Sequence, residues 1–196
     1  TDHAEGHCRH KKQSGGAGQF GEVMLRVEPL ARGAGFEFVD VVKGGAIPGV
    51  FMAAVEKGVQ QALAEGAVAG FPLHDLRVTV FDGKTHAVDG KEVAFVAAAR
   101  KATLQAVRGA KPIVLEPLVN IEVVTPESAM GDLTGDLAAK RGHITGSQAR
   151  GGGIVVITGQ MPLAELGDYQ NRLKSLTAGQ GSYSQTFSHY VPVNEA

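Results

Sequence analysis

The stretch Gly16-Ala17-Gly18-Gln19-Phe20-Gly21-Glu22-Val23 shows how the first part of this chain folds, because its glycines lead directly into a strand pattern. Residues 22–28 alternate in polarity, and one face carries Val23, Leu25 and Val27. A dinucleotide-binding glycine loop joins a strand to a helix instead, and a Walker A loop needs Lys and Ser or Thr where this chain has Glu and Val. The stretch therefore predicts a glycine-rich hairpin.

The same glycines also fit the ATP loop of protein kinases, G-x-G-x-x-G-x-V. Val41-Val42-Lys43 stands at a plausible distance for the ATP lysine. However, His74-Asp75-Leu76 lacks the arginine of the kinase catalytic loop, and Phe81-Asp82-Gly83 has the wrong order for D-F-G. A nucleotide-binding enzyme that uses Gly16–Gly21 is therefore kept only as an alternative of a different class. Taken alone, the loop could also be a flexible turn without a ligand.

Hydrophobic spacing predicts the other elements of the first part. Phe36–Val39 is a short strand that we expect to pair antiparallel with residues 22–28, and Leu76–Phe81 is a further strand that turns at Asp82-Gly83-Lys84. One helix runs from Pro48 to Gly66. A second helix begins at a capping box formed by Asp89 and Glu92 and packs closely on a sheet. Its inward face consists of small residues and one aromatic, namely Phe95, Ala99, Ala102 and Ala106.

The pattern changes around residue 112, where Pro112 and Glu116-Pro117 prevent a helix from continuing. We place a domain boundary there, with domains at residues 1–112 and 113–196. The second domain has the order strand, helix, strand, strand, helix, strand, which is that of a ferredoxin-like domain. The predicted fold class is α+β.

Composition restricts the class of protein. Basic residues concentrate in the first domain, with 14 Lys and Arg against 12 Asp and Glu, and are densest at Arg9-His10-Lys11-Lys12, where a polyanion would be met. The single cysteine, Cys8, excludes an internal disulfide, and no apolar run is long enough for a membrane span. We expect a cytoplasmic protein without a membrane partner. We expect no metal site either, because a strand would split His3, His7, Cys8 and His10 between two faces.

Several segments, in order along nearly the whole chain, resemble the last two domains of bacterial elongation factor G. The matching segments are His10–Val23, Arg32–Phe38, Gly44–Pro48, Val80–Asp89, Leu115–Pro117, Met130–Leu137, Arg141-Gly142, Pro162–Leu166, Leu176–Gly181 and Phe187–Tyr190. The resemblance implies a ribosomal protein S5 domain 2-like fold followed by a ferredoxin-like βαββαβ domain. It further implies a fragment of a translational GTPase that performs no chemistry itself, with GTP and Mg bound by upstream domains.

The resemblance also implies a role and a site. The first domain would contact ribosomal RNA, tRNA and mRNA in the decoding region and promote translocation, and the second would meet the large subunit. A ribosome-protection or ribosome-recycling paralogue is the alternative within the family. The residues implied to contact RNA lie in two loops and are Lys11, Lys12, Gln13, Ser14, Gly15, Gly16, Ala17, Gly18, Gln19, Asp82, Gly83, Lys84, Thr85 and His86. Of these, His86 matches the family's histidine at the tip of the domain.

Three positions depart from the family's common pattern. Many translocases carry Arg, Tyr and His where this chain has Ala17, Phe20 and Glu22. A guanidinium is lost, and we expect the carboxylate of Glu22 to lie near the RNA-facing loop and to weaken RNA contact. These departures resemble a second, elongation factor G-like paralogue.

Overall fold

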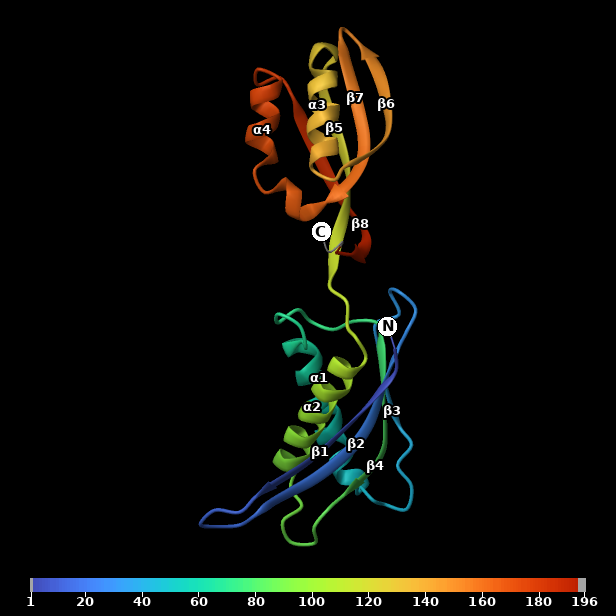
Figure 1. The fold of residues 1–196 in the computed structure, drawn as a ribbon, viewed down its shortest axis with the longest axis vertical. Helices are drawn as coiled ribbons and strands as arrows, with labels where there is room; N and C mark the ends of the chain where they lie inside the picture. The colour runs from blue at the N-terminus through green and yellow to red at the C-terminus, as the bar shows by residue number, and fades with distance from the viewer. Residues whose placement is uncertain (1, 194–196) are drawn as a thin grey trace. The chain divides into compact units, whose positions relative to one another are not determined.

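A computed structural model describes residues 2–193 and divides them into two units, the first ending at Ile113 and the second beginning at Val114 (Figure 1). Each unit combines one four-stranded sheet with helices, so the α+β class is confirmed. The division lies one residue from the expected boundary. Within the described residues, no helix is both long enough and apolar enough to cross a membrane.

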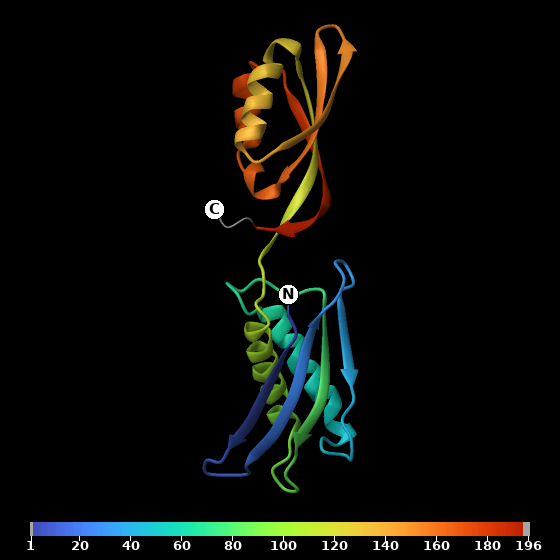
Figure 2. The ribbon, with the colours of Figure 1, turned by 45° about the vertical axis from the view of Figure 1, so that its right-hand side comes forward.

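Unit 1 has a four-stranded sheet in the order β1-β2-β4-β3, with both long helices on one face (Figure 2). Its elements are β1 (Ala4–Lys12), β2 (Gln19–Pro29), β3 (Phe36–Asp40), η1 (Gly49–Phe51), α1 (Met52–Glu65), β4 (Leu76–Lys84) and α2 (Glu92–Gly109). The predicted alternation of β2 holds, because Val23, Leu25 and Val27 are buried on the helix side. They pack with Val55 and Phe95 from the helices.

The expected pairing of β2 with β3 is wrong, because β4 lies between them. β4 runs antiparallel to β2 and parallel to β3, since helix α1 carries the chain back between β3 and β4. The start of β3 is held beside the start of β4 by two hydrogen bonds. The Gly35 N–H donates to the Asp75 carboxylate at 2.9 Å, and the Leu76 N–H donates to the Gly35 carbonyl at 3.1 Å.

Two local predictions also fail at the end of β4. Asp82-Gly83-Lys84 is strand, not turn, because Gly83 pairs with Val23 of β2, and the chain turns later, at residues 87–89. The N-cap of α2 is Lys91, without a side-chain cap, so the Asp89 and Glu92 capping box does not form. The Asp89 side chain lies instead next to Gly18.

The predicted close packing of α2 on the sheet is confirmed. Its inward residues Phe95, Ala99, Ala102 and Ala106 are fully buried. At Gly6 of β1 a Cβ atom would lie 1.9 Å from the backbone oxygen of Ala102, so only glycine permits this approach.

Unit 2 is a ferredoxin-like domain, and its order of elements agrees with the sequence prediction. The elements are β5 (Leu115–Pro126), η2 (Glu127–Ala129), α3 (Met130–Ala139), β6 (His143–Gly151), β7 (Ile154–Pro162), η3 (Leu163–Leu166), α4 (Tyr169–Leu176) and β8 (Ser182–Pro192). The antiparallel sheet has the order β6-β7-β5-β8, and both α helices cover one face of it (Figures 1 and 2). Val123, Leu133, Tyr169 and Leu173 form the centre of its core.

A methyl group at Gly6 tests the contact between α2 and β1. We expect Gly6→Ala to lower the free energy of unfolding of unit 1 by about 2 to 3 kcal/mol, because the clash is with backbone that cannot rotate away. Urea unfolding followed by circular dichroism measures this change. Tyrosine fluorescence reports on unit 2 alone, because the three tyrosines all lie there, and it should be unchanged.

The matched control is Gly16→Ala, where a Cβ atom would meet open space, and its effect should stay within about 0.5 kcal/mol. Equal stability of Gly6→Ala and the unsubstituted chain would contradict the contact.

Candidate functional site

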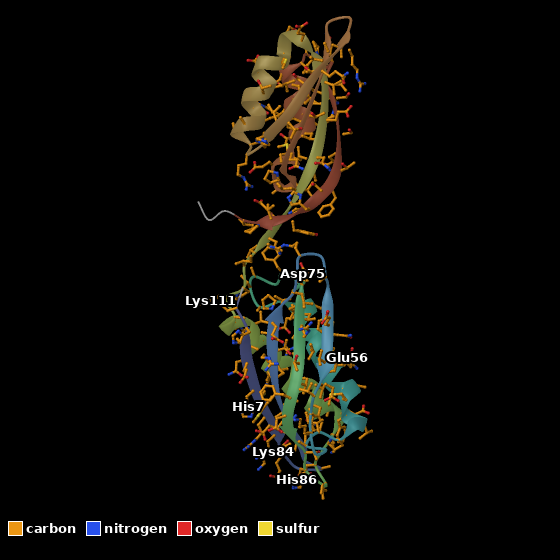
Figure 3. All side chains as sticks on the ribbon, turned by 90° about the vertical axis from the view of Figure 1, so that its right-hand side faces the viewer. His7, Glu56, Asp75, Lys84, His86 and Lys111 are labelled. Atoms are coloured by element: carbon orange, nitrogen blue, oxygen red, sulfur yellow. The ribbon has the colours of Figure 1, made fainter. Side chains whose placement is uncertain are left out.

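Three loops gather at one end of unit 1, which we call the loop end. They are residues 13–18 between β1 and β2, 41–48 between β3 and α1, and 85–91 between β4 and α2. The topology requires this meeting, because parallel strands β3 and β4 end on the same side, where antiparallel β2 begins. Lys84 and His86 lie at this end of the unit, and Asp75 lies at the opposite end (Figure 3).

The glycine loop, residues 13–18, projects beyond the last strand pair, Lys12 with Gln19. Residues 11–17 are all exposed, and Cβ atoms built at Gly15 and Gly16 would meet no atom within 4 Å. Gly15 has a φ of 57°, which suits a residue without a side chain. Within residues 2–193, the backbone of Ser14–Ala17 makes no hydrogen bond, so its N–H groups are available to a ligand.

His86 lies in the second loop and is held by backbone groups on its own turn. Its Nδ1 accepts hydrogen bonds from the N–H groups of Val88 at 3.3 Å and Asp89 at 3.1 Å. Its carbonyl oxygen accepts a third from the Gly90 N–H at 2.8 Å. The side chain remains 54% exposed, so the ring is fixed at its base and open at its outer edge.

Phe20 joins the glycine loop to the loop of His86. The Phe20 N–H donates to the Asp89 carbonyl at 2.7 Å, and Phe20 forms a parallel bridge with Gly90. The Phe20 ring lies 6.2 Å from the His86 ring, centre to centre. A Cβ atom at Gly18 would lie 2.7 Å from the Asp89 carboxylate, so this glycine makes room for the second loop. The two loops are therefore one connected structure.

Sequence reasoning missed Phe20, Asp89 and Gly90 as parts of the site. The sequence pattern marks Phe20 as a departure from the family and Asp89 as a helix cap, and it predicts no contact between the two loops. The pattern S/T/D-x-x-E does signal a turn before α2, but it does not show that the turn contacts a loop about seventy residues away.

The third loop is fastened to β4 through Ile47, which is 3% exposed. A Cβ atom at Gly83 would lie 2.6 Å from the Ile47 side chain and 2.2 Å from the Glu22 carbonyl oxygen. Gly83, one of the residues implied to contact RNA, is thus buried and serves packing. Gly18 is buried too, because it packs against the Asp89 side chain. Gln19 is partly buried, and its Oε1 lies 3.2 Å from His10 Nε2.

The loop end carries exposed lysines that no carboxylate among residues 2–193 neutralises. Lys11, Lys12, Lys43 and Lys84 form no ion pair with any residue between 2 and 193. Asp82, also exposed, accepts a hydrogen bond from the N–H of Gly83 at 2.8 Å. Unpaired cations beside bare backbone N–H groups suit an anionic partner.

Glu22 does not lie at the RNA-facing loop as a free carboxylate, which corrects the sequence expectation. Its side chain is 1% exposed on β2 and is bound across the strand pair by His7 Nε2 at 2.6 Å and Arg9 Nε at 3.0 Å. Burial alone would raise the pKa of Glu22, but the hydrogen bonds from Arg9 and His7 outweigh it and hold the pKa below its ordinary value. Its charge is neutralised within the sheet.

The histidines and cysteine near the N-terminus do not converge. Cys8 packs against the core of unit 1, where burial raises the pKa of its thiol, whereas His7 lies on the opposite face with Glu22. Across residues 2–193, no three side chains of His, Cys, Asp and Glu are grouped so that they could hold a metal ion.

Two family models match this chain, elongation factor G domain IV over residues 1–111 and the elongation factor G C-terminus over residues 113–196. The two units and their loop end thus define the class, a protein that contains the last two domains of a translation elongation factor. The chain belongs to the elongation factor G family.

Individual relatives agree with this assignment. An elongation factor G-like protein of Thermotoga maritima is 43% identical over 188 residues, which are 95% of this chain and 28% of the relative. A crystal structure of a protein from Thermus thermophilus matches this chain with a TM-score of 0.86 and 38% identity. The match covers 100% of this chain and 29% of the Thermus thermophilus chain. The chain therefore spans less than a third of the length of either relative.

The paired state of Glu22 predicts a dependence of stability on pH. A carboxyl group whose pKa is lowered by folding stabilises the fold above its unfolded pKa of about 4.3, and this contribution is lost as the pH falls through the folded value. Glu22→Gln should cost about 1 to 3 kcal/mol at neutral pH, and its difference from the unsubstituted chain should shrink below about pH 4. Urea unfolding at pH 7, 5, 4 and 3 measures both quantities.

Glu5→Gln is the control, because Glu5 is an exposed carboxylate on the same sheet and has no ion pair with residues 2–193. A pH-independent difference between Glu22→Gln and the unsubstituted chain would refute the ionised pair.

Proposed function

We propose that this chain forms domains IV and V of a translational GTPase and that its loop end contacts RNA in the decoding region of the small ribosomal subunit. In this proposal the contact promotes movement of tRNA and mRNA, and unit 2 meets RNA of the large subunit. GTP and Mg bind to upstream domains of the same cytoplasmic protein, and the two units described here perform no chemistry.

The observation that carries the proposal is the meeting of two RNA-suited loops at one end of unit 1. The glycine loop offers unbonded N–H groups beside Lys11 and Lys12, which suits close approach to phosphates. The second loop offers the outer edge of His86, and an exposed imidazole can stack on a base or donate to an RNA oxygen. The Phe20 link keeps the two loops in a fixed relation.

The second candidate within the family is a ribosome-protection or ribosome-recycling paralogue. Ala17 is exposed at the tip and supplies no cation where many translocases have arginine, so phosphate contact would be weaker. The name of the Thermotoga maritima relative, an elongation factor G-like protein, agrees with such a divergence.

A nucleotide-binding enzyme has less support. The loop Gly16–Gly21 leads into β2, so it has no helix N-terminus to hold a phosphate. Lys43, the residue considered for the ATP lysine, lies in the exposed loop between β3 and α1.

Replacing His86 tests the translocase role. In the full-length protein that carries this chain, we expect His86→Ala to slow translocation about tenfold or more, because one transition-state hydrogen bond is worth about 1.4 kcal/mol or more. The measurement is single-round translocation followed by fluorescent mRNA, together with ribosome-stimulated GTP hydrolysis, which should be unchanged.

The matched control is His74→Ala, an exposed histidine in the loop just before β4, at the opposite end of unit 1 from His86. If the unsubstituted protein moves mRNA no faster than a factor-free reaction, the translocase role is lost and the recycling or protection role is favoured.

Nucleotide binding separates the two classes of function. Titration of the 196-residue chain with ATP and with GTP, each with Mg, should release no heat of binding in a calorimeter. Saturable heat that disappears in a Gly16→Ala variant, where an added Cβ atom meets open space, would favour the enzyme.

A further inference from the structure

The turn that carries His86 fixes which ring nitrogen is a donor. Both backbone N–H groups that reach the ring, from Val88 and Asp89, donate to Nδ1. A nitrogen that accepts hydrogen bonds carries no proton, and a neutral imidazole has one N–H and one acceptor nitrogen. The proton of the neutral ring therefore belongs on Nε2, with the tautomer assigned from the hydrogen-bond network.

The Asp89 carboxylate is the competing group near Nδ1. Its Oδ2 lies 3.6 Å from Nδ1, which is beyond hydrogen-bond distance, whereas the two N–H donors lie at 3.1 and 3.3 Å. The backbone donors therefore determine the state of Nδ1.

Two backbone hydrogen bonds keep this turn in place. The Gly90 N–H closes it on the His86 carbonyl, and Gly90 has no side chain to meet that carbonyl, which would lie 2.7 Å from a Cβ atom. The Asp89 carbonyl accepts a hydrogen bond from the N–H of Phe20, at the start of β2 next to the glycine loop. A flip of the ring about its Cβ–Cγ bond would put Cδ2 where Nδ1 lies and would lose both hydrogen bonds from Val88 and Asp89, so the turn favours the observed orientation.

We propose that His86 presents a fixed donor, Nε2–H, at the loop end, and that this donor recognises a hydrogen-bond acceptor of RNA, a phosphate oxygen or a base acceptor. Val88, Asp89 and Phe20 are positioning residues for it, acting through their backbone. The inference rests on the proposed function and deepens it, because it names the chemistry that His86 contributes. The ring acts as an oriented neutral donor and needs no positive charge.

The tautomer is tested without the ribosome. Long-range ¹H–¹⁵N correlation of the 196-residue chain, above the pH at which its histidines are protonated, distinguishes a protonated Nε2 from a protonated Nδ1. We expect His86 to be in the Nε2–H form. His74, whose ring accepts no backbone N–H from residues 2–193, is the internal comparison. An Nδ1–H form, or an equal mixture of the two forms, would overturn the inference.

Two substitutions in the full-length protein then separate the Nε2–H donor from the anchor, which is the pair of hydrogen bonds that Nδ1 accepts from the turn. Asparagine keeps an acceptor at the position of Nδ1 and can hold the same turn, but it has no atom at the position of Nε2. Glutamine places an N–H near the position of Nε2 but loses the anchor. We expect His86→Asn to translocate as slowly as His86→Ala, about tenfold below the unsubstituted protein, and His86→Gln to recover part of the rate.

The outcomes of this comparison are distinct. Unchanged translocation in His86→Asn, with slow translocation in His86→Ala, shows that the anchored turn is required but the donor is not, and overturns the inference alone. Unchanged translocation in all three variants overturns the proposed function of the loop end, even where the tautomer is as expected. Circular dichroism of the same substitutions in the 196-residue chain checks that its two units stay folded.

Discussion

The close approach of α2 to the sheet determines the geometry of unit 1. At Gly6 the backbone of β1 meets the carbonyl oxygen of Ala102. At Gly21 of β2, an added Cβ atom would lie 3.0 Å from the backbone of Ala94 and Phe95 in the first turn of α2. Because α2 begins directly after residues 85–91, this contact fixes where the loop of His86 lies relative to β2. The link between Phe20 and Asp89 follows from it, so the arrangement of the site depends on two positions without side chains.

The sequence predicted this unit only as far as local patterns reach. Alternation and helical spacing located β2, β3, β4 and the two helices, since these periodicities follow from backbone geometry, but they gave no bounds for β1. They carried no information on which strands pair, so β2 and β3 were joined although β4 separates them. The anchoring of β3 by Asp75 and Gly35 joins residues forty positions apart, and no local rule reveals such a contact.

The candidate site could be predicted only in part, because contacts between residues far apart in the sequence leave no local pattern. Resemblance to a family located the glycine loop and His86, but the residues that join the loops lie between them in space and far apart in sequence. Glu22 illustrates the point. Its partner Arg9 is directly opposite in the β1–β2 register, and that register could not be known before the length of the hairpin turn was known. A carboxylate expected at the RNA surface is therefore a buried member of a cross-strand pair.

The departures at Ala17 and Phe20 affect the loop end in different ways. Ala17 lies in the exposed, unbonded part of the glycine loop, so a change there alters what a ligand meets and leaves the fold untouched. Phe20 takes part in the link between loops, but through its backbone N–H and the body of its ring, which tyrosine shares. The orientation of His86 is therefore compatible with either residue. Of the three departures, Ala17 changes the exposed surface of the glycine loop, Glu22 is paired within the sheet, and Phe20 leaves the contacts that orient His86 in place.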